Sequence, residues 1–258
     1  MEALYLDKTH IKNRFTKAAL SYQREALVQA RVAAELCGLI QRFVGGGQDT
    51  MLEIGCGTGI LSRQLLQHMH FEKYLLNDMS PAMLAHCSRL SYHPKQHLEL
   101  LLGDAERVSF PKGLNLIASS ATFQWLSDLD GFFAKCHEAL GKEGVLAFSS
   151  FGEQNLQELT NLSGIGLVYY SVALIKAKLE AAGFELLYSR DYKDVLYFDR
   201  PLKVLQHLKH TGVTGVQKET WTKGRLAEFL KDYDRLYRTS KGVPLSYHPI
   251  LMVARKIK

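Results

Sequence analysis

The sequence has little cysteine, and its four cysteines are scattered: Cys37, Cys56, Cys87 and Cys136. None forms a C-x-x-C pair, so the spacing predicts neither a zinc site nor a disulfide framework, and free thiols are expected. No cluster of His, Cys or carboxylate residues has the spacing of metal ligands either. We therefore expect a protein without a bound metal.

Long apolar runs are also missing. No stretch approaches the roughly 18 residues that a membrane-spanning helix needs. Residues 1–15 carry several charges and lack the apolar core of a signal peptide. The expectation is a cytoplasmic protein. With 47% hydrophobic and 22% charged residues in 258, the composition is that of one ordinary globular domain, which excludes disordered, collagen-like and coiled-coil chains.

An excess of one charge sign is absent from most of the chain but present in one segment. Lys and Arg exceed Asp and Glu by 32 − 26 = 6. Residues 200–241 hold ten basic and four acidic residues, so the rest of the chain is balanced at 22 of each sign. A local excess attracts acidic partners. A solvated helix face is the alternative interpretation.

Short apolar runs alternate with helix-period segments, which is typical of a parallel sheet covered by helices on both faces. The expected strands are 51–54, 73–77, 98–102, 114–119 and 145–151, and the expected helices between them are 58–69, one from Pro81, and 128–140. An α/β fold follows from this rhythm.

The flanking segments complete the predicted domain. One helix is expected over 11–43, ended by three glycines, and later helices over 171–182, 201–210 and 222–238. Strands are expected at 184–189 and 247–257, with 196–198 extending or pairing with the first of these. We divide this single domain into an N-terminal helical lid (1–44), a cofactor-binding core (45–199), a basic helical insertion (200–243) and a closing strand (244–258).

A glycine-rich loop follows the first expected strand and opens a helix, which is the setting of a ligand-binding loop. It reads Glu53-Ile54-Gly55-Cys56-Gly57-Thr58-Gly59. A dinucleotide fingerprint would require glycine at position 60, which is Ile60, and the Gly-Lys-Ser/Thr ending of a phosphate loop is absent. An acid followed by three glycines at alternate positions is instead associated with S-adenosylmethionine.

Two more acids end the next two expected strands. Asp78 lies 78 − 59 = 19 residues past the last loop glycine, where a carboxylate can accept both ribose hydroxyls. Its neighbour Met79 can pack on adenine, and Asp104, followed by Ala105, can accept the adenine amino group. Each acid alone is equally typical of a turn, but the three together indicate adenosylmethionine binding.

With these motifs in place, the chain resembles the class I S-adenosylmethionine-dependent methyltransferases over residues 45–150. This resemblance implies a Rossmann-like, mostly parallel sheet with helices on both faces, an N-terminal helix and a helical insertion before the last strand. It fixes the cofactor, not the acceptor. One position departs from the pattern, since Ser120 stands where an asparagine is usual.

A narrower resemblance spans nearly the whole chain, to the malonyl-acyl-carrier-protein O-methyltransferases of biotin synthesis. Three regions carry it. The first runs from Arg14-Phe15 to Tyr22, the second is Gln124-Trp125-Leu126 followed by Phe148 to Phe151 and Asn155 to Leu159, and the third is Leu205 to Gly215 together with Pro244 to His248. The resemblance implies methyl esterification of the free carboxylate of malonyl-acyl carrier protein, with S-adenosylhomocysteine as the second product. It also implies that an acidic carrier protein is the partner, without membrane or nucleic acid.

The implied site combines the motifs with the chemistry of the transfer. A carboxylate is already ionised at neutral pH, so no general base is expected, and the enzyme supplies proximity and a dry pocket. Aromatic side chains suit the wall of such a pocket, and the candidates are Tyr22, Trp125, Tyr169, Tyr170 and Tyr247. Tyr22 is predicted to position cofactor and acceptor. The predicted cofactor residues are Gln29, Glu53, Gly55, Cys56, Gly57, Gly59, Asp78, Met79, Asp104, Ala105 and Ser120. The predicted substrate residues are Tyr22, Gln124, Trp125, His207, Lys209 and Tyr247, with Arg225, Lys231 and Arg235 binding the partner.

Two other functions stay open from the sequence alone. A methyltransferase with the same cofactor could act on a small carboxylic acid or another metabolite. An RNA-binding protein or RNA methyltransferase could use the basic segment to bind phosphates.

Overall fold

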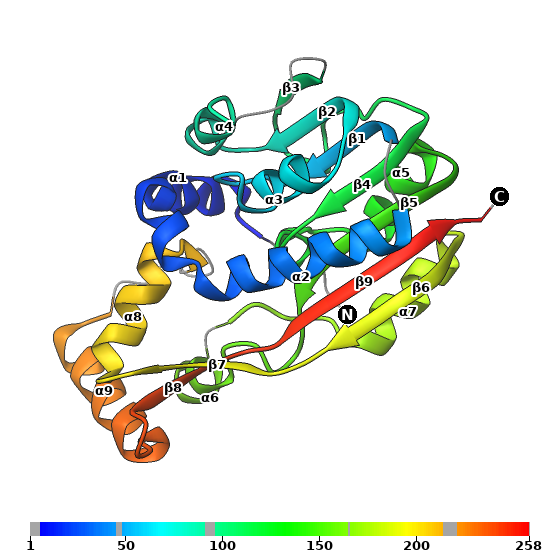
Figure 1. Cartoon of the computed structure of the whole chain (residues 1–258). Coiled ribbons are helices and arrows are strands. Elements are labelled where there is room, and N and C mark those ends of the chain that lie inside the picture. The colour runs from blue at the N-terminus through cyan, green and yellow to red at the C-terminus, as the bar shows by residue number, and fades with distance from the viewer. Residues whose placement is uncertain (1–5, 45–47, 91–95, 165, 214–220, 258) are drawn as a thin grey trace.

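A seven-stranded sheet forms the centre of the protein (Figure 1). The computed structural model describes residues 6–44, 48–90, 96–164, 166–213 and 221–257. The strands are β1 (Gln48–Ile54), β2 (Phe71–Asp78), β3 (His97–Leu102), β4 (Leu114–Ser119), β5 (Leu140–Phe151), β6 (Phe184–Asp191), β7 (Asp194–Phe198), β8 (Val243–Tyr247) and β9 (Pro249–Lys256). The helices are α1 (Lys8–Glu25), α2 (Leu27–Val44), α3 (Ile60–His68), α4 (Pro81–Cys87), η1 (Phe123–Trp125), α5 (Leu129–Ala139), α6 (Gln157–Ser163), α7 (Val172–Ala181), α8 (Pro201–His210) and α9 (Lys223–Tyr237).

The strand order is β3-β2-β1-β4-β5-β9-β6. The four pairs from β3 to β5 are parallel, and β9 is antiparallel to both β5 and β6. The predicted fold class, a mostly parallel α/β sheet with helices on both faces, is therefore confirmed. No helix among the described residues is long and apolar enough to cross a membrane.

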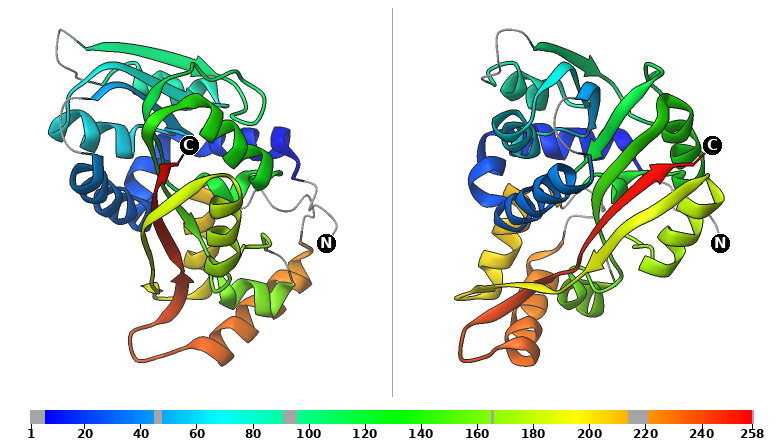
Figure 2. Two further views of the ribbon diagram at one scale, coloured as in Figure 1. Left: turned by 90° about the vertical axis from the view of Figure 1, so that its right-hand side faces the viewer. Right: turned by 45° about the vertical axis from the view of Figure 1, so that its right-hand side comes forward.

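Alternate residues of the central strands face opposite layers of helices, as the period of a strand requires. Met51 packs in the cluster beneath α2, α3 and α4, whereas the next residue, Leu52, packs in the cluster beneath α5 and α7. Figure 2 shows α5 and α7 on the face of the sheet opposite α2. Both faces are covered, which explains the near-continuous apolar runs of these strands.

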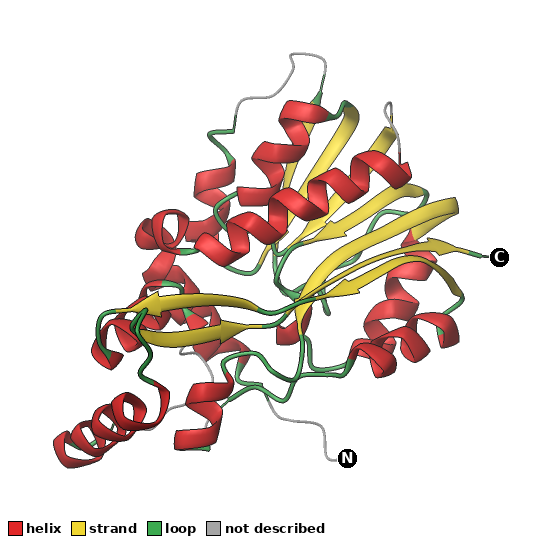
Figure 3. Ribbon diagram, turned by 60° about the horizontal axis from the view of Figure 1, so that its bottom comes forward, coloured by secondary structure: helices red, strands yellow, loops and turns green. Residues whose placement is uncertain are grey.

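A second, two-stranded sheet extends beyond the first. β7 and β8 pair antiparallel, from Asp194 with Tyr247 to Phe198 with Val243. Figure 3 shows this ribbon projecting past the main sheet, with helices beside it. A third apolar cluster joins the ribbon to α8, α9 and the inner face of α2. Of the two alternatives expected for 196–198, pairing with 184–189 is wrong, because these residues pair with β8.

Two predicted elements are each divided in the structure. The helix expected over 11–43 is interrupted at Ala26, whose φ of −80° and ψ of 54° are not helical, so α1 turns away from α2. The strand expected over 247–257 instead forms β9, while Tyr247 ends β8 in the other sheet. The structure also contains α6, which the sequence pattern did not predict.

Candidate active site

The glycine loop connects β1 to α3 at the carboxyl end of the sheet. Gly55, Gly57 and Gly59 have positive φ values of 64°, 55° and 78°, a conformation that favours glycine. A Cβ on Gly55 would lie 2.2 Å from the Thr122 hydroxyl, whereas a Cβ on Gly57 would have no protein atom within 4 Å. Gly57 lines a cavity, so the loop leaves room there for a ligand.

Asp78 ends β2 directly beside this loop. One of its carboxylate oxygens accepts a hydrogen bond from Gly57 N at 3.0 Å, and the other accepts from Ser80 N at 2.8 Å. Burial raises the pKa of Asp78 to about 6, although these backbone hydrogen bonds act to lower it. Each oxygen of a carboxylate can accept a second hydrogen bond. Asp78 can therefore hold the loop and accept ligand hydroxyls together.

Asp104 follows β3 on the same edge of the sheet. Its side chain accepts a hydrogen bond from Glu106 N at 3.1 Å. Lys8, at the start of α1, lies 3.8 Å from the Asp104 carboxylate, forms an ion pair with Glu106, and donates to the Trp125 carbonyl at 2.8 Å. These contacts fix the start of α1 across the edge of the sheet.

These elements enclose a cavity with about 730 Å³ of space, part of it open to solvent. Seven predicted cofactor residues line it: Gly55, Gly57, Asp78, Met79, Asp104, Ala105 and Ser120. Ser120 contributes a hydroxyl 3.2 Å from that of Ser149. The residues thus include carboxylate acceptors from β2 and β3 and an open glycine backbone from β1.

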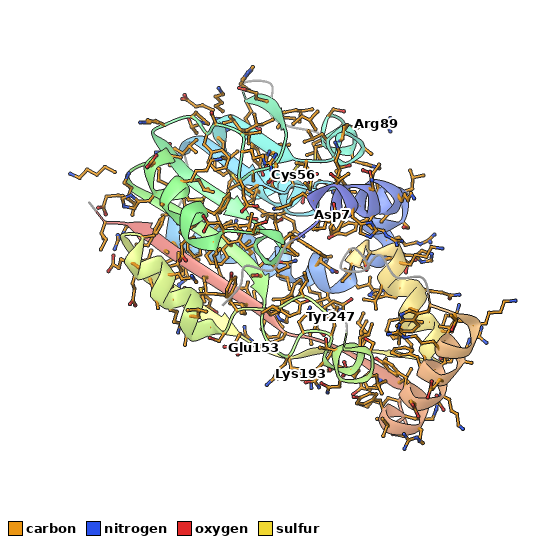
Figure 4. The ribbon with its side chains drawn as sticks, turned by 180° about the vertical axis from the view of Figure 1, so that it is seen from behind. Asp7, Cys56, Arg89, Glu153, Lys193 and Tyr247 are labelled. Atoms are coloured by element: carbon orange, nitrogen blue, oxygen red, sulfur yellow. The ribbon has the colours of Figure 1, made fainter. Side chains whose placement is uncertain are left out.

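A second chamber adjoins this cavity. Phe15, Tyr22, Ala121 and Trp125 line both spaces. The walls specific to the second chamber come from α2, η1, the end of β5, the region around α6, the segment after α8, and β8: Gln29, Gln124, Phe151, Asn155, Leu167, Tyr169, Val213 and Tyr247. Figure 4 labels Cys56 in the glycine loop and Tyr247 at the end of β8, which mark the two ends of this region.

An aromatic wall from α1 lies where the two spaces meet. The Phe15 ring packs edge-on against Trp125 with centroids 5.4 Å apart, and against Tyr22 at 6.1 Å. Burial and the nearby Asp78 raise the pKa of Tyr22 far above its ordinary value, so its hydroxyl stays protonated at neutral pH. Of the predicted substrate residues, Tyr22, Gln124, Trp125 and Tyr247 are brought together here.

Four predicted cofactor residues lie outside the first cavity as the structure describes it. Glu53 is buried behind the loop, where it accepts a hydrogen bond from the Tyr74 hydroxyl and burial raises its pKa to about 7. The Cys56 thiol faces Cys87 with 3.5 Å between the sulfurs, and Gly59 forms the N-cap of α3. Gln29 lines the second chamber instead.

The two predicted substrate residues of α8 are in different environments. His207 is buried, and its Nε2 lies 2.8 Å from the Tyr247 hydroxyl. Burial lowers the pKa of His207, so its ring is neutral at pH 7. The ring contacts the Tyr247 hydroxyl and helps to fix its position. Lys209 is exposed on the other side of the helix. Neither lines either space, which differs from their predicted contact with substrate.

Two residues outside the predicted substrate set line the second chamber: Asn155, which had no predicted role, and Tyr169, which was only a candidate for the aromatic wall. Asn155 Nδ2 donates to the Tyr169 hydroxyl at 2.7 Å, and both residues line the chamber. Lys8 was also missed, although it lines the first cavity. Tyr169 follows α6 in a segment without regular secondary structure, so no periodicity marked it.

The predicted partner residues lie on α9, away from both spaces. Arg225, Lys231 and Arg235 are exposed. Lys231 and Arg235 are one helical turn apart, and Arg235 also pairs with Asp232 at 3.1 Å. Among the described residues, no group of three or more His, Cys, Asp or Glu side chains has the arrangement of a metal site.

Comparison with known proteins identifies similar sequences along the whole chain. Residues 52–148 match the family model of a methyltransferase domain. The chain is 39% identical over 263 residues to the malonyl-[acyl-carrier protein] O-methyltransferase of Bacteroides thetaiotaomicron, covering 98% of this chain and 100% of that protein. It is 39% identical over 251 residues to the protein of the same name from Bacteroides fragilis, covering 96% of this chain but about half, 50%, of that longer relative.

Solved structures show the same fold at low sequence identity. The YcgJ protein of Bacillus subtilis matches with a TM-score of 0.62 and 13% identity, covering 87% of this chain and 99% of that chain. Phosphoethanolamine N-methyltransferase 2 of Haemonchus contortus, solved with phosphomonomethylethanolamine and S-adenosylhomocysteine, matches with a TM-score of 0.52 and 17% identity, covering 87% of this chain and 52% of that chain. At these identities the similarity is one of fold.

Proposed function

Because the chain belongs to the malonyl-[acyl-carrier protein] O-methyltransferases, a family of S-adenosylmethionine-dependent enzymes, we propose that it esterifies the free carboxylate of malonyl-acyl carrier protein. The proposed setting is the cytoplasm, at an early step of pimeloyl and biotin synthesis. The observation that carries this proposal is the pair of adjoining spaces, which share the aromatic residues Phe15, Tyr22 and Trp125. A cofactor and an acceptor can meet at that junction.

The residues of the first cavity fit the cofactor that the family uses. When bound, S-adenosylmethionine supplies a methyl group on a cationic sulfur. We propose that Asp78 accepts the ribose hydroxyls, that Asp104, Met79 and Ala105 hold the adenine, and that Gly55 and Gly57 let the amino-acid portion approach the backbone. Ser120 replaces the usual asparagine with a shorter hydroxyl. Because Glu53, Cys56 and Gly59 do not line the first cavity, we propose that they stabilise the conformation of the glycine loop and do not contact the cofactor.

The second chamber suits an acceptor that is already anionic. A carboxylate needs no base at neutral pH, so the chain's own contribution is to hold the reacting atoms in line and to exclude water. The reacting charges are opposite and disappear as the new bond forms, so a dry, aromatic environment favours the transition state over the separated ions. We propose that Tyr22 positions the two reactants, with Gln124 and Trp125 beside the acceptor.

Mass spectrometry of the acyl chain tests the proposal directly. The purified protein is incubated with S-adenosylmethionine and malonyl-acyl carrier protein, and the acyl group should gain the mass of one methyl group. Free malonate and malonyl-coenzyme A are the comparison substrates. Transfer to the carrier-linked form should be preferred. Equal transfer to the small acids, without an effect of salt, would instead indicate a methyltransferase of small carboxylic acids, and retention on RNA at physiological salt would support the RNA alternative.

The basic side chains of α9 should increase the encounter with an acidic carrier protein. Changing Arg225, Lys231 and Arg235 together to Glu should raise KM for malonyl-acyl carrier protein about tenfold at low salt, by analogy with other charge-steered associations. The KM of the unmodified protein should rise with added salt and approach that of the variant. Cofactor affinity should not change, and calorimetry with S-adenosylhomocysteine measures it.

The matched control moves the same charge change to the other end of the sheet. Arg42, Lys112 and Lys142 are exposed near the amino ends of the strands, opposite the edge that carries the site. Their combined change to Glu should leave KM for the carrier substrate nearly unaltered. Equal effects of the two triple variants would assign the change to net charge alone.

A further inference from the structure

The second chamber has a hydrogen-bond donor whose orientation the structure fixes. We propose that Tyr169, held by Asn155, donates a hydrogen bond to the carboxylate of the acceptor, so that a neutral phenol rather than a cation recognises this anion. The inference rests on the proposed function, because the anion is the malonyl carboxylate.

The orientation of Asn155 determines what Tyr169 can do. Asn155 Oδ1 accepts a hydrogen bond from the His248 backbone N–H at 3.2 Å, so the other side of the amide, Nδ2, faces the Tyr169 hydroxyl at 2.7 Å. An amide NH2 group can only donate. The phenol oxygen therefore accepts from Asn155, and the hydrogen of the phenol remains for another acceptor.

The surroundings of Asn155 are themselves ordered. Its backbone N–H donates to the Gly152 carbonyl at 2.9 Å, and Gly152 N donates to the His248 carbonyl at 2.8 Å. Asn155 is 3% exposed. The amide is thus a fixed support, and it presents Tyr169 to the chamber that Tyr169 lines.

The phenol also has the right protonation state. Burial raises the pKa of Tyr169 to about 12, although the hydrogen bond from Asn155 acts to lower it. At neutral pH the hydroxyl is therefore protonated and can donate. Burial also raises the pKa values of Tyr22 and Tyr247, so the other two phenols that line the chamber are protonated as well.

The chamber contains polar side chains among its aromatic and apolar ones, but no charged side chain in the part of the chain that the structure describes. Its lining residues there include no Lys, Arg, His, Asp or Glu. Gln29 is 6% exposed, and its side-chain oxygen has no hydrogen-bond partner within the described structure. A buried acceptor without a partner is costly, and a donor group on a bound ligand would satisfy it. The chamber thus offers a bound ligand an acceptor in Gln29 as well as the phenol donor of Tyr169.

A neutral donor suits the reaction better than an ion pair. A hydrogen bond to a charged acceptor is strong, so a phenol can orient the carboxylate and select an acid over a neutral acyl chain. A Lys or Arg clamp would withdraw more electron density from the oxygen that must attack the methyl group. Tyr169 can hold one carboxylate oxygen while the other faces the first cavity.

The test is the kinetics of Tyr169→Phe, which removes only the hydroxyl. KM for malonyl-acyl carrier protein should rise about tenfold or more, as expected for a lost hydrogen bond to an anion. The affinity for S-adenosylhomocysteine should stay the same. Inhibition by the neutral product, the methyl ester of malonyl-acyl carrier protein, should change less than threefold, because this ligand lacks the anion. A purely structural role of the hydroxyl would weaken both acyl ligands alike.

Two control variants complete the experiment. Tyr170→Phe removes the neighbouring hydroxyl, which does not line the chamber, and should leave KM unchanged. Lys209→Gln removes one of the exposed cations of α8, which lines neither space, and should do the same. An unaltered KM in Tyr169→Phe, or a tenfold rise in Lys209→Gln, would overturn the inference. Absence of methyl transfer by the unmodified protein would instead overturn the proposed function, and the inference with it.

Discussion

Replacing Gly57 with valine should reduce the affinity for S-adenosylhomocysteine more than a hundredfold. The first side-chain atom would have no protein atom within 4 Å, and Gly57 lines the first cavity. The added isopropyl group would therefore occupy the space that the ligand needs. Isothermal titration calorimetry measures the loss, and S-adenosylmethionine should show the same loss as its demethylated product.

Backbone strain must be separated from this steric effect. Gly57 has a φ of 55°, and a β-branched residue in this left-handed region costs about 1–2 kcal/mol. Gly113 provides a matched control because its φ is 79° and its Cβ would also have no neighbour within 4 Å, but it lies outside the cavity. Gly113→Val should lose comparable thermal stability and retain full affinity. Normal binding by Gly57→Val would contradict the assignment of the loop.

The sequence predicted the parallel core because its signals are local. The short apolar runs are bounded by turn residues, three of the first four are followed by a helical period, and β1 to β5 lie where these runs were expected. The carboxyl ends of parallel strands share one edge of the sheet. The sequence alone therefore placed Asp78 and Asp104 near the glycine loop. Their individual contacts with a ligand remain predictions.

The breaks in the predicted elements depend on contacts between distant parts of the chain. Ala26 carries no local signal that ends a helix, yet α1 leaves the line of α2 there. Ser21 of α1 donates to the carbonyl of His210, the last residue of α8, at 3.0 Å, whereas α2 packs on the sheet. A similar division occurs at His248, where the chain leaves the second sheet and enters the first. Helical and strand periods do not contain this information.

The substrate side was less predictable for the same reason. His207 and Lys209 are two residues apart on α8, so a helix turns them to different sides. Only the packing of α8 on the β7–β8 ribbon decides that His207 is the buried one. Tyr169 is positioned by Asn155 and, through it, by His248, which is 93 positions away from Asn155. A motif within one segment cannot show this arrangement.

Replacing Asp78 with asparagine should lower the affinity for S-adenosylhomocysteine about a hundredfold. The two carboxylate oxygens accept from Gly57 N and Ser80 N, and both can accept from ribose hydroxyls as well. Hydrogen bonds to a charged group contribute about 1.5–3 kcal/mol each. Asparagine lacks the charge, and its NH2 group would face one of the two backbone N–H groups, which loosens the loop.

The pH dependence of binding distinguishes this role from a general defect of the loop. Hydroxyl donors favour the anionic form of Asp78, so binding lowers its pKa from the value of about 6 that burial produces. Affinity should therefore be complete above pH 6 and decline as the pH falls below it, because protons then compete with the ligand. Calorimetry between pH 5 and 8 should show this decline in the unmodified protein and in Asp104→Asn. In Asp78→Asn the proton has no carboxylate to bind, so the decline below pH 6 should disappear, and its persistence there would assign the titration to another group.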